Sequence, residues 1–270
     1  MNITKRNKVA GAIYGFAIGD AMGATTEFMS AEQIHKVYGK VTDIIGGGWL
    51  NLKAGEVTDD TQMSMCVMDA LMKYPDNINK FEGLCASNFV EWLKQGPKDI
   101  GGQCSKGIYN IVIGKKIGAD NQALGNGSLM RAMPCALVNN IQFNVCQGKL
   151  THNNLRCSRI IQTYSRLIQK YLNGKIYIGK IKGLLEPSGY IRNTFNNSVY
   201  WSCQETFEDA ILGAVNHGGD ADTIAAITGS LAGAKFGFDN IPKRWIEQLN
   251  PDIKIFLEKF KNFVFSYLQI

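Results

Sequence analysis

Apolar side chains recur with helical spacing along most of the chain, and the alternation typical of strands is nearly absent. Steps of three and four residues place such side chains on one face of a helix. The clearest cases are Met63, Val67, Ala70 and Leu71, followed by Ile224, Ile227, Leu231 and Ala234. Weaker patterns predict helices over residues 82–93, 155–171, 207–215 and 251–268. The fold class that follows is all-α.

Few signals interrupt this helical pattern. The best strand candidate, residues 175–179, is poor, and six prolines are too few to break many elements. Asparagine-rich patches at 139–144 and 193–197 predict surface loops. No internal repeat or low-complexity linker divides the chain, so we expect a single domain over residues 1–270.

The amino-terminal segment permits two interpretations. Basic residues within positions 5–8 precede an apolar run over 9–18, which is the order found in a secretory signal. The run is short, however, and it carries Gly11, Gly15 and Gly19 four residues apart. Glycines at that spacing let two helices approach closely, so a packed helix explains the same residues.

Composition indicates a soluble globular protein. Of 270 residues, 45% are hydrophobic and 19% are charged, which is enough apolar surface for a packed core. No apolar run reaches the roughly 18 to 20 residues that a membrane span needs. The 29 Lys and Arg exceed the 23 Asp and Glu by six, but they form no aromatic-interleaved stripe. We therefore expect neither a membrane nor a nucleic acid as a partner.

Cysteine usage points to a reducing compartment. Seven cysteines occur, which is an odd number, and no CxxC motif is present. This pattern indicates neither a zinc knuckle nor a disulfide framework. We expect buried free thiols and a cytoplasmic location.

Acidic residues gather at the start of two predicted helices. In the first run, GEVTDDT over residues 55–61, Thr58 is placed as the N-cap, with Asp59 and Asp60 in the first turn. Such acids stabilise a helix dipole by about 0.3–1 kcal/mol, but two aspartates flanked by threonines exceed what capping needs. In the second run, HGGDADT over 217–223, Asp220 and Asp222 again lie beside a threonine.

Oxygen-rich clusters of this kind suit hard divalent cations such as Mg²⁺ or Mn²⁺. Four aspartates that converge without lysine or arginine between them repel strongly unless cations neutralise them. A two-metal site follows if the two helix starts meet in space. A third acid, Glu27, follows the small-residue segment 15–23, and from the residues alone it is equally well an inward ligand or an exposed side chain.

Together these segments resemble the ADP-ribosylglycohydrolase family. The matching runs are GFAIGDAMGATTEF (15–28), GEVTDDTQM (55–63), GNGSLMRAMP (125–134) and AVNHGGDADTIAAITGSLAGAKFG (214–237). Weaker matches occur at 99–101, 151–152 and 189–191, and all stand in the family's order between about residues 9 and 237. The resemblance favours a core helix over a cleaved signal at the amino terminus.

The resemblance implies an all-helical fold around a binuclear Mg²⁺ or Mn²⁺ centre that holds ADP-ribose. It implies six metal ligands, namely Thr58, Asp59, Asp60, Asp220, Asp222 and Thr223. It also places Glu27 beside the metals, and Glu27 and Asp60 are the candidates for the general base.

Further positions match the family's substrate contacts. The loop of Gly125, Asn126, Gly127 and Ser128 would touch the ADP-ribose, Asp99 and Gly101 would lie near the phosphates, and His152 and Tyr190 would contact the substrate. Arg131, four residues past Gly127, is interpreted as a structural ion-pair partner. The chain departs from many relatives at His217, where they have an apolar residue. It also departs at residues 102–104, where they often have a polar residue and paired threonines.

The expected function is hydrolysis of ADP-ribose from a modified protein side chain, with arginine as the favoured linkage. An enzyme acting on serine-linked ADP-ribose, poly(ADP-ribose) or ADP-ribose esters is the alternative within the same chemistry. A non-catalytic ADP-ribose-binding or structural relative is the alternative outside it, although such a role would not require all the acidic residues. The partner is an ADP-ribosylated protein or a small ADP-ribose conjugate, and a monomer is expected.

Overall fold

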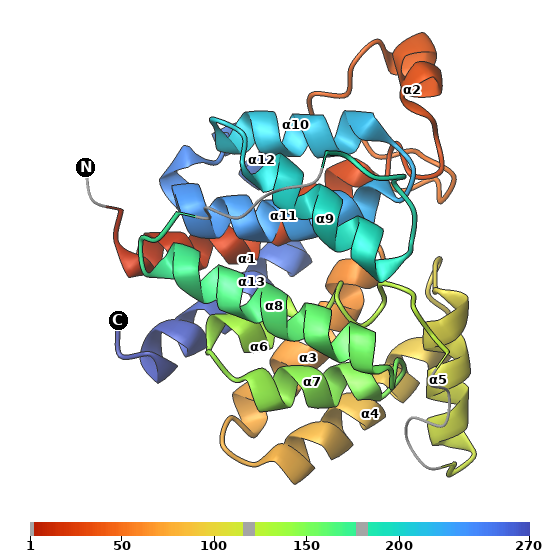
Figure 1. The fold of residues 1–270 in the computed structure, drawn as a ribbon, viewed down its shortest axis with the longest axis vertical. Helices are drawn as coiled ribbons and strands as arrows, with labels where there is room; N and C mark the ends of the chain where they lie inside the picture. The colour runs from red at the N-terminus through yellow and green to blue at the C-terminus, as the bar shows by residue number, and fades with distance from the viewer. Residues whose placement is uncertain (1–2, 116–121, 177–182) are drawn as a thin grey trace.

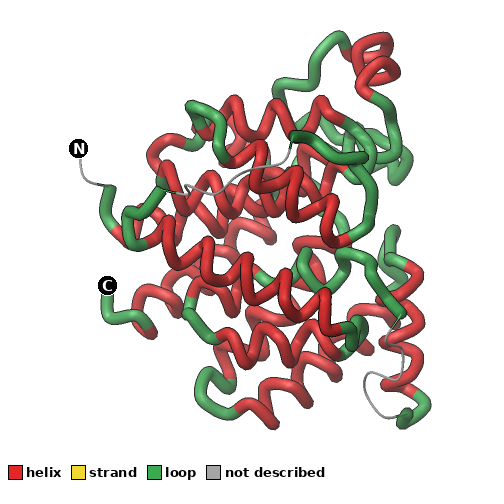
Figure 2. The backbone as a smooth tube through the Cα atoms, in the orientation of Figure 1, coloured by secondary structure: helices red, strands yellow, loops and turns green. Residues whose placement is uncertain are grey.

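A computed structural model describes residues 3–115, 122–176 and 183–270 of the chain. These residues form thirteen α-helices and one short 3₁₀ helix, with no β-sheet among them (Figure 2). The all-α prediction is therefore confirmed. In chain order the elements are α1 (Lys5–Gly23), α2 (Ala31–Tyr38), α3 (Asp59–Lys73), α4 (Ile78–Lys94), α5 (Gly102–Val112), α6 (Met133–Leu137), α7 (Ile141–Lys149), α8 (Leu155–Leu172), α9 (Ile191–Ser202), α10 (Phe207–His217), α11 (Ala221–Phe236), η1 (Phe238–Asn240), α12 (Lys243–Gln248) and α13 (Pro251–Tyr267).

Helices α1 and α11 lie side by side through the middle of the molecule (Figure 1), and both are buried along nearly their whole length. Their backbones touch directly. A Cβ atom on Gly15 would lie 2.3 Å from the carbonyl oxygen of Gly229, and one on Gly19 would lie 2.0 Å from that of Ala225. The spacing of Gly11, Gly15 and Gly19 therefore allows the two helices to pack closely, and the signal-like segment is a core helix.

The remaining helices surround this central pair. Helices α9 and α10 pack on α11, while α3 and α4 pack together on the other side, with α7 against α4 (Figure 1). Helix α13 packs against α1 and α3 and buries Leu257, Phe260 and Val264. Among the described residues, no helix combines the length and the apolar character that crossing a membrane requires. All seven cysteines are free thiols, as predicted, but only four of them are buried, and Cys66, Cys146 and Cys203 are partly exposed.

Two predictions about irregular segments need correction. Residues 193–197 lie inside α9 and not in a surface loop, because the buried Asn197 amide receives a hydrogen bond from Leu185 N and donates one to Leu185 O. In the patch 139–144, only Asn139 and Asn140 lie in a turn, and Asn144 is buried in α7. Of the strand candidate 175–179, residues 175 and 176 are not in a strand, and 177–179 lie outside the described residues.

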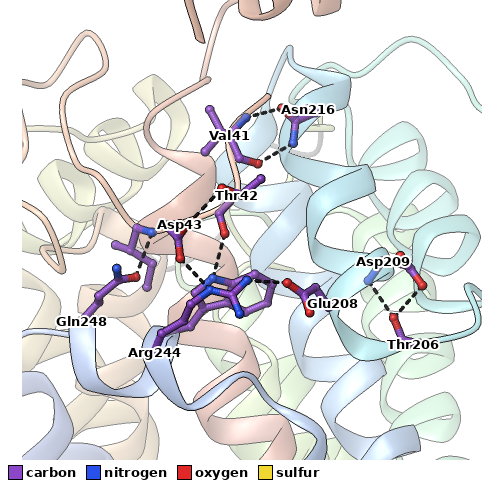
Figure 3. Close-up of polar contacts among 11 residues, drawn as sticks. Val41, Thr42, Asp43, Thr206, Glu208, Asp209, Asn216, Arg244 and Gln248 are labelled. Atoms are coloured by element: carbon purple, nitrogen blue, oxygen red, sulfur yellow. Dashed lines mark hydrogen bonds and ion pairs between the residues drawn. The ribbon is translucent and has the colours of Figure 1, made fainter. Parts of the chain in front are cut away.

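The long segment between α2 and α3 is tied to the carboxy-terminal part of the chain (Figure 3). Arg244 pairs with both Asp43 and Glu208, and Trp245 Nε1 donates to the Thr42 carbonyl at 2.9 Å. Asn216 exchanges two hydrogen bonds with the backbone of Val41, at 2.8 and 2.9 Å. These contacts fix the segment that leads into the start of α3.

Candidate active site

The start of α3 is held by a buried acid from α1. Thr58 is the N-cap, and its side-chain oxygen accepts a hydrogen bond from Asp60 N, as the sequence predicted. Asp20 is fully buried and accepts hydrogen bonds from Thr58 N at 3.1 Å and Thr61 N at 3.0 Å. A carboxylate at a helix start satisfies backbone donors that the helix itself leaves unpaired. Asp20 therefore orients the Thr58–Asp60 turn, a role that sequence analysis did not assign to it.

The start of α11 is locked to the segment that carries Glu27. Gly218 and Gly219 both have positive φ, at 77° and 67°, and turn the chain from α10 into α11. Phe28 N donates to Gly219 O at 2.7 Å, and Gly219 N donates to Met29 O at 2.8 Å. These backbone bonds place Glu27 beside the turn that ends in Asp220.

The acid-bearing turns converge. Carboxylate oxygens of Glu27, Asp220 and Asp222 lie within 4.8 Å of one another, and those of Asp59, Asp60 and Asp222 do the same. Asp222 thus belongs to two overlapping clusters. Thr223 Oγ1 donates to Asp60 Oδ2 at 3.2 Å and so links the two helix starts directly. The predicted meeting of the two turns occurs, while the roles of the residues as metal ligands stay predictions.

Burial opposes the negative charge of this cluster. It raises the pKa of Asp60 and of Asp222 well above the usual range, and neighbouring carboxylates raise both further. Burial likewise raises the pKa of Asp59 to about 8 and that of Asp220 to about 6. Among the described residues, no lysine or arginine lines the cavity that these acids face.

The donor set fits a hard divalent cation. Asp60 Oδ1 and Asp222 Oδ1 are buried, and within the described part of the chain no group donates a hydrogen bond to either atom. A buried carboxylate oxygen without a partner is costly, and a metal ion removes that cost. Carboxylate and hydroxyl oxygens are also the ligands that Mg²⁺ and Mn²⁺ prefer.

Glu27 is buried, with only 5% of its surface exposed, so the interpretation as a surface side chain is wrong. Burial raises its pKa to about 8, and the hydrogen bond from Trp49 partly offsets this rise. Trp49 Nε1 donates to Glu27 Oε2 at 2.6 Å, and the Trp49 ring lies against Phe28. Sequence analysis missed Trp49. It follows a run of three glycines, Gly46–Gly48, which all have positive φ, and that run was the available signal.

These acids line one part of a cavity of about 260 Å³, here called the acidic wall, and Gly101, Gly125 and Gly127 line another part, here called the glycine wall. Side-chain atoms of His152 and Cys104 would lie 2.9 Å and 2.5 Å from a Cβ on Gly127, so only glycine fits there. Asn126 Nδ2 donates to Asp220 Oδ2 at 2.5 Å and joins the two walls. The predicted substrate residues that line the cavity are Asp99, Gly101, Gly125, Asn126, Gly127 and His152.

Comparison with known proteins shows to which family the chain belongs. The sequence profile described as ADP-ribosylglycohydrolase matches residues 1–186 and 177–264. The chain belongs to the ADP-ribosylglycohydrolase family. It is 32% identical over 276 residues to the ADP-ribosyl dinitrogen reductase glycohydrolase of Rhodospirillum rubrum, with 92% of each chain covered.

Other members of the ADP-ribosylglycohydrolase family agree with this assignment. The chain is 30% identical over 285 residues to the ADP-ribosylarginine hydrolase Tri1 of Pseudomonas putida (strain GB-1), covering 90% of this chain and 74% of that protein. A solved structure titled ADP-ribosylglycohydrolase-related protein complex superposes with a TM-score of 0.83 at 23% identity and covers 98% of both chains. That structural likeness shows the shared fold.

Two of the substrate positions expected from the ADP-ribosylglycohydrolase family lie outside the cavity lining. Ser128 is fully buried behind the glycine loop. Tyr190 is partly buried and forms a backbone bridge with Gly125, while its neighbour Gly189 lines the cavity. His217, the departure from many relatives, also lies outside the lining and packs its ring near Trp201.

Arg131 differs from its prediction as an ion-pair partner. Its guanidinium is fully buried, and among the described residues no carboxylate pairs with it. It donates to Gly127 O at 2.8 Å, to Gln147 Oε1 at 2.7 Å and to Thr151 Oγ1 at 2.7 Å, and it lies over the Phe89 ring. Its neutral acceptors lie in the glycine loop and beside His152, so Arg131 holds the glycine wall of the cavity in place.

Proposed function

We propose that this member of the ADP-ribosylglycohydrolase family is a metal-dependent hydrolase that removes ADP-ribose from modified arginine side chains of proteins. The observation that carries the proposal is the convergence of Glu27, two acidic helix starts and a glycine-lined wall on one cavity. The relatives named for the reductase and for ADP-ribosylarginine support the arginine linkage.

Two cations, Mg²⁺ or Mn²⁺, would be held by Thr58, Asp59, Asp60, Asp220, Asp222 and Thr223. The two overlapping carboxylate clusters support this number, because Asp222 belongs to both and is placed to serve two ions. Bound divalent cations would supply Lewis acidity and a template for the ribose hydroxyls. Their positive charge would also relieve the repulsion among the buried carboxylates.

The reaction adds water across the glycosidic bond between ribose and the arginine nitrogen. Water gives its oxygen to the anomeric carbon, the C–N bond breaks, and the guanidine leaves with a proton. Glu27 is the favoured acceptor of the proton from water, because its raised pKa suits a base near neutral pH. Trp49 holds the Glu27 carboxylate in place through Oε2 and leaves Oε1 for the water. Asp60, also in the cavity, is the second candidate.

The glycine wall would receive the rest of the substrate. Gly101, Gly125 and Gly127 permit close backbone approach of the phosphates and ribose, and Asn126 and His152 supply polar side chains beside them. Asp99 lies at the edge of the cavity near Asp59. Tyr190 is proposed to contact the adenosine part from outside the described cavity.

The decisive experiment uses one carrier protein ADP-ribosylated on arginine and another ADP-ribosylated on serine. The protein is stripped with a chelator and then supplied with Mg²⁺ or Mn²⁺ while release of free ADP-ribose is measured. We expect release from the arginine-linked protein only when metal is present. Release from the serine-linked protein alone would establish the alternative linkage, and metal-independent release would overturn the metal centre. Binding of ADP-ribose with no release from either protein would indicate a non-catalytic relative.

A further inference from the structure

A second and larger cavity adjoins the active site. It is a groove of about 630 Å³ between α3, α4, α13 and the segment of residues 50–57. Asp59 and Asp99 line both this groove and the smaller active-site cavity. The two spaces therefore meet at Asp59, an expected metal ligand, and at Asp99.

The groove combines an apolar surface with acidic side chains. Its apolar lining includes Leu50, Leu52, Met65, Trp92, Ile253 and Phe256. Its charged lining consists of five acids, Glu56, Asp59, Asp69, Glu91 and Asp99, against one base, Lys98. The whole chain has a net charge of +6, so the sign of charge in the groove is opposite to that of the protein as a whole.

The outer carboxylates of the groove remain available to a new cation. Asp69 pairs with Lys73 and Glu91 pairs with Lys94, and both lysine side chains are more than half exposed. Ion pairs between exposed side chains contribute about 0–1 kcal/mol, so a ligand cation can replace Lys94 on Glu91 at little cost. The Asp69 side chain is 23% exposed and also accepts a hydrogen bond from Asn88 Nδ2 at 3.1 Å. The wall beside them is fixed, because Trp92 Nε1 donates to Gln62 Oε1 at 2.8 Å.

We propose that this groove binds the part of the substrate that leaves, namely the arginine side chain and the residues of the protein that flank it. The inference rests on the proposed hydrolase function, since it needs ADP-ribose in the smaller cavity. An arginine side chain has an apolar stem of three methylenes and a planar cation that carboxylates bind in a forked geometry. A serine linkage offers neither feature, so the groove gives the enzyme its preference for arginine.

The size of the groove supports a polypeptide as the occupant. Cavities of about 300–1,000 Å³ hold ligands much larger than one side chain. A guanidinium near Asp99 leaves the outer part of the groove, beside Asp69 and Glu91, for flanking residues of the substrate protein. The charge of that outer part favours basic flanking residues.

The first test uses N-acetyl-argininamide, an analogue of the leaving group, with the metal-loaded protein. Its neutral isostere N-acetyl-citrullinamide is the matched control ligand. We expect the arginine compound to compete with the arginine-linked protein substrate about 10-fold more strongly, as one charge-assisted hydrogen bond predicts. It should also quench indole fluorescence in the wild type and not in Trp92→Phe, with ADP-ribose present. Equal inhibition by both compounds, or no Trp92-dependent quenching, would overturn the groove as a guanidinium site.

The second test neutralises the outer carboxylates in the double variant Asp69→Asn/Glu91→Gln. We expect the KM for the arginine-linked protein to rise about 5-fold with kcat unchanged, because two exposed charge contacts are lost. Inhibition by ADP-ribose should not change. The control is Glu205→Gln, an exposed acid in the turn before α10 and outside the groove lining.

The outcomes of these tests separate the two proposals. A wild type that never releases ADP-ribose from arginine-linked protein contradicts the proposed function, whereas the quenching by N-acetyl-argininamide decides the groove independently of turnover. Normal wild-type release, with the same KM in the double variant, overturns the groove alone. An equal rise in KM for a serine-linked substrate would also overturn it, because the groove would then not distinguish the linkages.

Discussion

The two walls of the active-site cavity differ in charge, because one carries buried carboxylates and a buried guanidinium lies behind the other. One wall gathers the carboxylates of Glu27, Asp59, Asp60 and Asp222 with no basic residue in the described lining. Behind the other wall lies the guanidinium of Arg131, surrounded by neutral acceptors. A direct ion pair between Arg131 and one of these carboxylates would neutralise both charges and fill the cavity between them.

Separated charges of this kind favour a ligand that brings both signs. Cations on the acidic side would relieve the repulsion among the carboxylates, and the positive potential behind the glycine loop would favour an anion such as a diphosphate. The acidic wall is therefore expected to control metal loading and turnover, and the Arg131 wall to control substrate affinity and the stability of the loop. The following variants test this division.

The greatest loss is expected from Asp222→Asn. Asp222 belongs to both carboxylate clusters, so turnover should fall by about 10³-fold or more, as for loss of a metal ligand. In chelator, the same variant should raise Tm, because the buried acid must either stay charged beside other carboxylates or bind a proton on folding, and asparagine does neither. Circular dichroism should show an unchanged helical content.

The matched control for this variant is Asp252→Asn, because Asp252 is also an aspartate in the first turn of a helix. It should lose about 0.3–1 kcal/mol of stability and keep full activity. Normal activity of Asp222→Asn, or a lowered Tm in chelator, would contradict the role of the acidic wall.

The pH dependence of the stability of the metal-free protein should report the burial of these acids, to which the neighbouring carboxylates add. Burial raises the folded-state pKa of Asp59 and of Glu27 to about 8, whereas the unfolded chain releases these protons near pH 4. The folded state therefore binds more protons between about pH 4 and pH 8, and stability must fall as pH rises through this window. The slope is about 1.4 kcal/mol per pH unit for each extra proton bound.

Urea unfolding in chelator at a series of pH values measures this slope. Asp59→Asn should give a flatter dependence than the wild type, and saturating Mg²⁺ or Mn²⁺ should restore stability at pH 8. Identical slopes in the variant and the wild type would contradict a raised pKa of Asp59 in the folded protein.

On the opposite wall, Arg131→Lys keeps the positive charge and loses the planar fork of donors. Unsatisfied acceptors at Gly127, Gln147 and Thr151 should lower the free energy of unfolding by about 2–4 kcal/mol. Arg131→Met should in addition weaken inhibition by ADP-ribose by about 10-fold, because the buried positive charge is removed. Thermal unfolding and product-inhibition constants measure these effects. An ADP-ribose affinity that is the same in the Lys and Met variants would show that the charge does not act on the ligand.

The mildest effect is expected from Trp49→Phe. The ring is kept, but Glu27 loses the hydrogen bond that lowers its pKa. With the pKa of Glu27 higher, less of the base is ionised at pH 7, so kcat/KM should fall about 2- to 5-fold there and recover at higher pH. Phe28→Leu removes the neighbouring ring and leaves the donor, so its pH profile should match the wild type. An unshifted profile for Trp49→Phe would exclude Glu27 as the base.

Much of this architecture could be predicted from local sequence pattern. Helical periodicity identified α3, α4, α8, α10, α11 and α13, and the acidic runs identified both helix starts. These features depend on residues a few positions apart. The meeting of Asp60 with Asp222 could not be derived from the residues alone and followed only from the family resemblance.

What local pattern could not supply are contacts between residues distant in sequence. Asp20 supports the start of α3 from α1, at sequence separations of 38 and 41 residues, and nothing near Asp20 indicates this. Asn197 lies in an asparagine-rich stretch, which is typical of a loop. It is nevertheless part of α9, and its side-chain amide forms hydrogen bonds with the backbone of Leu185. Arg131 was assigned a carboxylate partner by general expectation, whereas its real acceptors are neutral groups brought together by the fold.

The backbone-to-backbone contact between α1 and α11 limits how far the acids carried by these helices can move relative to one another. Because backbone packs directly on backbone at Gly15 and Gly19, no side chain lies between the helices there whose size or rotamer could change their separation. Asp20 belongs to α1 and Asp222 to α11, so the close packing of the two helices also fixes the distance between these two acids. Sequence changes during evolution would then leave the distance between these two helices constant. They would alter specificity only through the loops and grooves around the active-site cavity.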